Sequence, residues 1–236
     1  MKDNHKISMT NKEGRFKTTV WIVSGPSCCG KSTFIEKIPF EKVGFPSADL
    51  PVFFPAQLLR GESIEKYQDV ILHYNILRPY RIYSEARSKS GNGYYKCIKM
   101  LSTFWRKSKV QSYTWEELKP NWDYQKDSLF LYLNKLGVHL KAVVLVANKQ
   151  LIKQRMQKRK LVEKSWALDK ELSYPRSYWL NVLEHVNLLA VYNFWINFLR
   201  SNRIEYQLYN SDTIDYPQLN SFDDIPNILY GEKNAV

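Results

Sequence analysis

Residues Thr18–Thr33 read TTVWIVSGPSCCGKST, and this stretch decides the fold. Its apolar first half predicts a buried strand, and the amphipathic run Phe34–Ile38 that follows predicts a helix. Between them, Gly25 and Gly30 allow the main chain to wrap closely around a polyphosphate, while successive N–H groups point inward at the start of the helix. The pattern therefore predicts a loop that binds a nucleoside triphosphate.

The stretch Val20–Thr33 resembles the phosphate-binding loop of the P-loop NTPase superfamily. Its Gly-Pro-Ser opening and Gly-Lys-Ser-Thr close are most similar to the small-molecule and nucleotide kinases. In this motif Lys31 reaches the β- and γ-phosphates of ATP or GTP, and the Ser32 hydroxyl binds Mg²⁺. The nucleotide-binding residues predicted from the loop are Gly25, Ser27, Cys28, Cys29, Gly30, Lys31, Ser32 and Thr33.

Guanylate kinase is the named member that the loop resembles most. The segment Arg60–Tyr67 is similar to its nucleotide-monophosphate site, but the Thr-Thr-Arg segment expected before it is replaced by Asp49–Phe54. The resemblance therefore covers the loop, and the rest of the chain diverges from it.

Apolar runs separated by helical segments predict an α/β fold. The expected strands are 18–24, 43–48, 69–74, 141–146 and 204–209. Right-handed crossovers between them predict a three-layer sandwich around a mainly parallel, five-stranded, P-loop kinase-like sheet. Residues 1–16 are expected to form a mobile tail, and residues 17–236 a single domain. Within that domain, a helical insert over 80–135 lies between the third and fourth strands and could form a lid. Further helices are expected over 122–136 and 150–159, with one long helix over 176–202.

Two arginines follow the fourth strand on the next predicted helix. Arg155 and Arg159 are one helical turn apart and share a face. In P-loop kinases, arginines in this arrangement form the base of the lid that closes over the transferring phosphate. The resemblance implies the same role here, because neutralising the γ-phosphate oxygens is the main contribution a protein makes to phosphoryl transfer. A solvated basic helix end is the alternative interpretation.

The sequence departs from the kinase pattern where an acid is expected to organise the metal. The third strand ends in Asn75, and its Asp69 lies at the opposite end. Asp49 is predicted to follow the second strand and is the candidate general base, with His73 as an alternative. His73, Asn75 and Arg78 lie where ligands bind in open α/β sheets, so they are the candidate substrate residues.

Composition narrows the class of protein. The 236 residues are 44% hydrophobic and 14% aromatic, which indicates a packed globule. No apolar stretch approaches the roughly 20 residues of a membrane span, and the N-terminus has charges where a signal peptide needs an apolar core. Of the three cysteines, Cys28 and Cys29 are adjacent in the loop, which favours a reducing compartment. We therefore expect a cytoplasmic protein.

The net charge of +12 indicates an anionic ligand. The predicted activity is transfer of the γ-phosphate of ATP, or of another nucleoside triphosphate, to a small hydroxyl- or phosphate-bearing acceptor. One alternative is a polynucleotide kinase or another enzyme acting on nucleic acid. Its candidate stacking and charged residues are Tyr94, Tyr95, Trp105, Arg106 and Trp115. The other alternative is a nucleotide-binding regulatory module with weak NTPase activity, which the missing strand-end acid favours.

Overall fold

The sheet contains six strands in the order β2-β3-β1-β4-β5-β6 in the computed structural model. The structure describes residues 18–37, 40–80, 120, 123–162 and 176–231. The strands are β1 (Thr19–Gly25), β2 (Val52–Phe53), β3 (Asp69–Asn75), β4 (His139–Val146), β5 (Glu205–Asn210) and β6 (Gln218–Leu219). The first five strands pair in parallel, and β6 pairs antiparallel with β5. The predicted α/β class and the mainly parallel, P-loop kinase-like sheet are confirmed, with one strand more than expected.

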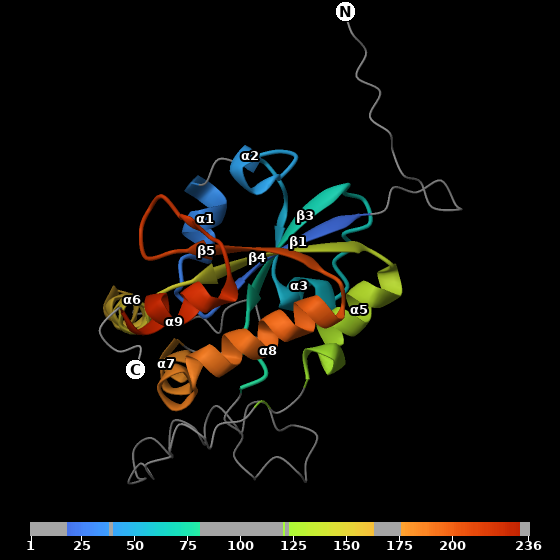
Figure 1. Ribbon diagram of the computed structural model, residues 1–236. Helices are drawn as coiled ribbons and strands as arrows, with labels where there is room; N and C mark the ends of the chain where they lie inside the picture. Colours follow the sequence, from blue (N-terminus) through green and yellow to red (C-terminus); the bar gives the residue numbers. More distant parts are fainter. Residues whose placement is uncertain (1–17, 38–39, 81–119, 121–122, 163–175, 232–236) are drawn as a thin grey trace, which may run out of the picture.

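Helices cover both faces of the sheet (Figure 1). One face carries α1 (Lys31–Lys37) and α2 (Phe40–Val43). The opposite face carries α3 (Pro55–Leu59), α5 (Ser128–Leu136) and α8 (Leu188–Ser201). Because each face of a parallel sheet is covered, most residues in β1, in β3 and in the second half of β4 are apolar and buried. The three-layer arrangement is therefore confirmed.

The core beneath the loop centres on Trp195 of α8. Its ring stacks on Tyr74 of β3 at a centroid distance of 5.1 Å, and its Nε1 donates a hydrogen bond of 2.9 Å to Ser24 Oγ. Ser24 is the residue directly before Gly25. Burying a tryptophan with its N–H paired stabilises the core without leaving a polar group unsatisfied. The loop is thus attached to the buried core through the residue before Gly25.

The prediction of a second strand over 43–48 is wrong. Val43 is the last residue of α2, and Gly44 follows with φ +80°. The strand that forms instead is β2, whose Val52 pairs with Ile71. Pro46 has no N–H to donate to a ladder, which disfavours a strand over 43–48.

The long helix predicted over 176–202 is interrupted. It forms two helices, α7 (Arg176–His185) and α8. Asn187 lies between them and caps α8, because its side chain accepts a hydrogen bond from the Ala190 N–H. Similarly, the helix predicted over 122–136 is described as η2 (Tyr124–Lys126) followed by α5, with Asp127 as the N-cap of α5.

Three further helical elements complete the described fold. They are α6 (Lys149–Val162), η3 (Phe222–Asp224) and α9 (Ile225–Tyr230). The predicted tail over 1–16, most of the insert and its aromatic residues between Tyr94 and Trp115 lie outside the described residues. In the part of the chain that the structure describes, no helix has the length and apolar character needed to cross a membrane.

Candidate nucleotide-binding site

The loop leaves β1 through Gly25, whose backbone only glycine adopts easily. Its φ is +153°, and a Cβ atom here would lie 2.5 Å from Cys29 Sγ and 2.9 Å from the Leu145 carbonyl oxygen. The second glycine, Gly30, has φ +102° and is not crowded in this way. Gly25 is therefore required both for its positive φ and for the close approach of the chain to β4. Gly30 is required only for its positive φ.

The two cysteines of the loop have different roles. Cys28 is half-buried and adopts φ +63°, a left-handed conformation that is rare outside glycine. Cys29 is fully buried and packs against Gly25. Burial raises the pKa of the Cys29 thiol, although the nearby Lys31 ammonium opposes this. Cys29 is therefore a protonated packing residue.

Lys31 lies inside the loop. Its Nζ donates hydrogen bonds of 3.0 Å to the Gly25 carbonyl and 2.6 Å to the Pro26 carbonyl, and only 3% of the residue is exposed. A buried ammonium needs oxygen partners, and phosphate oxygens are stronger partners than neutral carbonyls. The Lys31 ammonium is thus buried inside the loop, and its role in binding phosphates stays a prediction.

The first turn of α1 supplies further donors. The Phe34 N–H bonds to the Gly30 carbonyl, so the amides of Lys31, Ser32 and Thr33 precede the first intrahelical bond. The Ser32 side chain is exposed at this turn. One hydroxyl oxygen is sufficient for Mg²⁺ that arrives with a triphosphate, because Mg²⁺ keeps several waters and takes other ligands from the phosphates. Among the described residues, no cluster of three His, Cys, Asp or Glu side chains could hold a metal ion.

The segment after β5 forms a wall against the loop. Ser211 Oγ lies 2.7 Å from the Cys29 carbonyl oxygen and 3.0 Å from the Val146 carbonyl oxygen. Its backbone N–H also donates to the Val146 carbonyl over 2.7 Å. These contacts connect the loop to the ends of β4 and β5, so the loop is braced from one side.

Arg155 reaches this wall from α6. Its Nη2 donates a 3.2 Å hydrogen bond to the Ser211 carbonyl, whereas its buried Nη1 has no hydrogen-bond partner among the described residues. A Cβ atom on Gly30 would lie 3.8 Å from that Nη1. The structure therefore places Arg155 beside the Gly25–Thr33 loop, and its role at the transferring phosphate stays a prediction. Arg159 lies on the same helix, but its side chain is outside the described part of the chain.

An acidic side chain stands near Arg155. Asp212 Oδ1 accepts a 2.7 Å hydrogen bond from the Asn148 N–H. Burial raises the pKa of Asp212, while that hydrogen bond and the charge of Arg155 act in the opposite direction. The carboxyl group balances part of the positive charge at this end of the site.

The end of β3 borders the loop on its other side. Asn75 is paired with Gly25 in the sheet, and its Oδ1 accepts a 3.0 Å hydrogen bond from the Leu77 N–H. Arg78 follows in the same turn. His73 is half-buried within β3, and its ring lies 4.9 Å from that of Phe54. The three predicted substrate residues thus share one strand end, and Asn75 lies directly beside the loop.

The reason for choosing Asp49 as general base does not hold. Asp49 was expected to follow the second strand, but it precedes β2, which runs parallel to β3. It therefore lies before the strand, not at the carboxyl end where the loop lies. Asp69 also lies at the remote end of the sheet, where it accepts a hydrogen bond from Trp21 Nε1.

Sequence reasoning missed Ser211 and Asp212, which directly follow β5 as the structure has it. Their position was itself a signal, because ligands bind outside the carboxyl ends of parallel strands. It also missed Asp127, whose proximity to Arg78 no local pattern indicates.

No protein-family model matches this chain, and no curated protein matches it. Among solved structures, the chain is similar to one from the PezAT chromosomal toxin-antitoxin system of the human pathogen Streptococcus pneumoniae. The two share 13% sequence identity with a TM-score of 0.38, and the match covers 96% of this chain and 81% of the other. A likeness at this level carries no argument about function. The fold class rests on the sheet order and on the loop after β1, which together define a P-loop kinase-like α/β fold.

Proposed function

We propose that this protein is a phosphotransferase that moves the γ-phosphate of ATP or GTP to a small acceptor carrying a hydroxyl or phosphate group. The observation that carries the proposal is the position of Lys31, buried inside the Gly25–Thr33 loop with Arg155 beside Gly30. Two positive side chains then face one loop whose backbone geometry suits a polyphosphate.

The reaction that fits these groups is an in-line displacement. An acceptor oxygen attacks the γ-phosphorus, the bond to the β–γ bridging oxygen breaks, and the nucleoside diphosphate leaves with that electron pair. When the acceptor is a hydroxyl group, its proton passes to solvent water. Lys31 and the loop amides hold the phosphate chain, and Arg155 neutralises negative charge near Gly30. Mg²⁺, when bound, would add positive charge at the phosphate oxygens, and the Ser32 hydroxyl is the ligand this chain offers it.

The residues on the two sides of the loop suggest where the acceptor binds. The wall formed by Ser211, Asp212 and Arg155 lies on the β4–β5 side, whereas Asn75 and Arg78 lie on the β3 side. We place the acceptor on the β3 side, because Arg78 is the positive group there. His73 and Arg159 remain proposed contributors to acceptor and phosphate binding.

A thermal-shift titration tests the proposal directly. A ligand that binds only the folded state raises the melting temperature according to its affinity. We expect ATP or GTP with Mg²⁺ to raise the melting temperature of the protein, and nucleosides without phosphates to leave it unchanged. Small phosphorylated and hydroxylated compounds would then be screened for phosphate transfer from the better nucleotide. No shift with any nucleoside triphosphate would contradict the proposal.

Arg155 provides a more specific prediction. Arg155→Gln should lower turnover by roughly 10²-fold and weaken triphosphate binding less, because a charge placed at the transferring phosphate acts most strongly in the transition state. Steady-state kinetics and equilibrium nucleotide binding measure the two effects separately. Lys158→Gln removes an exposed charge from the same helix and serves as the control. Arg159→Gln asks whether the second arginine contributes. Equal, small losses of turnover and affinity would show that Arg155 only supports the wall beside the loop and does not act at the transferring phosphate.

A regulatory nucleotide-binding module is the second candidate. The observation favouring it is that β3 ends in Asn75, whose carboxamide oxygen is already engaged by the Leu77 N–H, where a metal-organising acid is expected. Such a module would bind the triphosphate with the same loop but hydrolyse it slowly, unaffected by any acceptor. Measuring NTPase rates with and without the acceptors that bind distinguishes it from a kinase.

A further inference from the structure

The turn after β3 fixes Arg78 relative to the loop. The Ile76 N–H donates to the Gly25 carbonyl over 3.3 Å, and the Arg78 N–H donates to the Asn75 carbonyl over 3.2 Å. The Asn75 side chain also accepts a hydrogen bond from the Leu77 N–H, so each backbone N–H from Ile76 to Arg78 has a partner. The backbone of this turn, including Arg78, is therefore fixed relative to Gly25.

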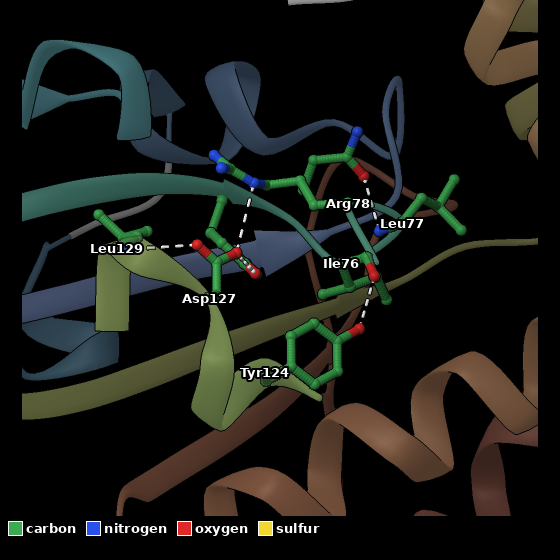
Figure 2. Close-up of polar contacts among 8 residues, drawn as sticks. Ile76, Leu77, Arg78, Tyr124, Asp127 and Leu129 are labelled. Atoms are coloured by element: carbon green, nitrogen blue, oxygen red, sulfur yellow. Dashed lines mark hydrogen bonds and ion pairs between the residues drawn. The ribbon is translucent and has the colours of Figure 1, made fainter. Parts of the chain in front are cut away.

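Asp127 forms an ion pair with Arg78, although the two residues are far apart in the sequence. Figure 2 shows the two side chains pointing toward each other, with Asp127 Oδ2 3.6 Å from Arg78 Nε. Only 2% of the Asp127 side chain is exposed, compared with 16% for Arg78. A buried carboxylate is costly without a counter-ion, so the ion pair restricts Arg78 to this orientation.

Two more donors hold the carboxylate itself. Asp127 Oδ1 accepts the Leu129 N–H over 3.0 Å, which caps α5, and the Tyr74 hydroxyl donates to Oδ2 over 3.2 Å. The Tyr74 ring also lies beneath the guanidinium of Arg78, with Cζ 5.8 Å from the ring centroid. The carboxylate is thus fixed by one backbone and one side-chain hydrogen bond before it meets Arg78.

The guanidinium of Arg78 contacts Asp127 through its Nε end. In the part of the chain that the structure describes, the buried Nε has no hydrogen-bond partner, and it forms the ion pair with Asp127 Oδ2. Among the described residues, no hydrogen bond involves either terminal nitrogen of Arg78. A guanidinium has five N–H donors in one plane, so contact through Nε leaves the two Nη groups for an oxyanion that they can bind in bidentate geometry.

We propose that Asp127, supported by Tyr74, is a positioning residue that presents the Nη groups of Arg78 to an anionic group of the acceptor, a phosphate or a carboxylate. This inference rests on the proposed phosphotransferase function and narrows its acceptor to an anionic compound. Holding a flexible arginine in its binding orientation before the ligand arrives reduces the entropy lost on binding. The competing interpretation is purely structural, with Arg78 serving only as the counter-ion of the helix cap.

Inorganic phosphate is the probe for this site. The loop is first filled with the non-hydrolysable triphosphate AMP-PNP and Mg²⁺, and phosphate is then titrated while binding is followed by calorimetry. We expect a second, saturable phosphate site in the wild-type protein. Arg78→Gln should weaken phosphate binding by roughly tenfold or more, and Arg78→Lys by less, since a lysine keeps the charge without the fork of donors.

The positioning role is tested by Asp127→Asn, which keeps the cap of α5 and removes the negative charge. We expect phosphate affinity to fall several-fold while AMP-PNP affinity is unchanged. Tyr74→Phe should cause a smaller fall and provides the test should Asp127→Asn prove unstable. Arg200→Gln, which removes an exposed charge at the far end of α8, is the control for net charge.

The outcomes separate the inference from the proposed function. AMP-PNP binding without a second phosphate site would overturn the inference and leave the function standing. Unchanged phosphate affinity in Arg78→Gln would do the same. Asp127→Asn and Tyr74→Phe could instead lower the thermal stability and leave phosphate affinity unchanged. That result would show that Asp127 and Tyr74 have only a structural role. Failure of wild-type protein to bind AMP-PNP would contradict the function itself.

Discussion

Replacing Lys31 with methionine is expected to lower triphosphate turnover by roughly 10²-fold or more while the protein remains folded. Methionine is of similar length and apolar, so the substitution removes the charge inside the loop without leaving an unpaired buried ammonium. The loss should appear in both nucleotide affinity and turnover, because Lys31 would contact the triphosphate throughout the reaction. Calorimetric titration with ATP or GTP and a phosphate-transfer assay measure the two quantities.

The control is Lys37→Met, at the exposed end of the same helix. It alters the net charge of α1 equally but lies remote from the loop, so affinity should stay within about twofold of wild type, as for an exposed, screened charge. Wild-type affinity and turnover in Lys31→Met would remove the basis of the proposed function.

Gly25→Ala is expected to destabilise the fold by about 2–5 kcal/mol and to abolish nucleotide binding. The added methyl group would lie 2.5 Å from Cys29 Sγ and 2.9 Å from the Leu145 carbonyl oxygen, at a φ of +153° that alanine rarely adopts. The Leu145 oxygen belongs to the central sheet and cannot move away easily. The loop must therefore shift away from β4, which would break the contact between Ser211 and Cys29.

Gly44 provides a control that distinguishes backbone strain from steric crowding at Gly25. Gly44 also has a positive φ, +80°, but a Cβ atom there would meet no atom within 4 Å. Gly44→Ala should therefore cost only about 1–2 kcal/mol and leave nucleotide affinity intact. Denaturant unfolding gives both free energies of unfolding. Equal losses in the two variants would show that crowding at Gly25 does not position the loop.

Local sequence patterns determined the elements that lie next to one another along the chain. The run from Thr19 to Lys37 predicted β1, the loop and α1, because apolar periodicity and two glycines define a strand, a turn and a helix without reference to distant residues. The strands β3, β4 and β5 were also recognisable from local patterns. The placement of Arg155 also followed, since it lies on the helix that leaves β4 at the edge of the sheet that holds the loop.

Elements with weak local signals were decided by tertiary contacts. A two-residue β2 has no periodicity to detect, so the strand was misplaced and Asp49 was assigned to the wrong side of it. The division of one predicted helix into α7 and α8 is instead marked by a local contact, the hydrogen bond from the Ala190 N–H to Asn187, and it was missed because the sequence remains apolar and helical on both sides.

Only the folded chain brings together the residues that complete the candidate site. Ser211 lies 182 positions from Cys29, and Asp127 lies 53 positions from Tyr74, yet each pair is joined by a hydrogen bond. No periodicity or motif encodes such contacts, because they depend on the order of strands in the sheet and on the packing of α5 against it. The sequence by itself determined the strand, the glycine-containing loop and the helix from which phosphate binding is predicted. Tertiary structure decided which wall supports the loop and how Arg78 is held beside it, since a hydrogen bond depends on distance in space and not along the chain.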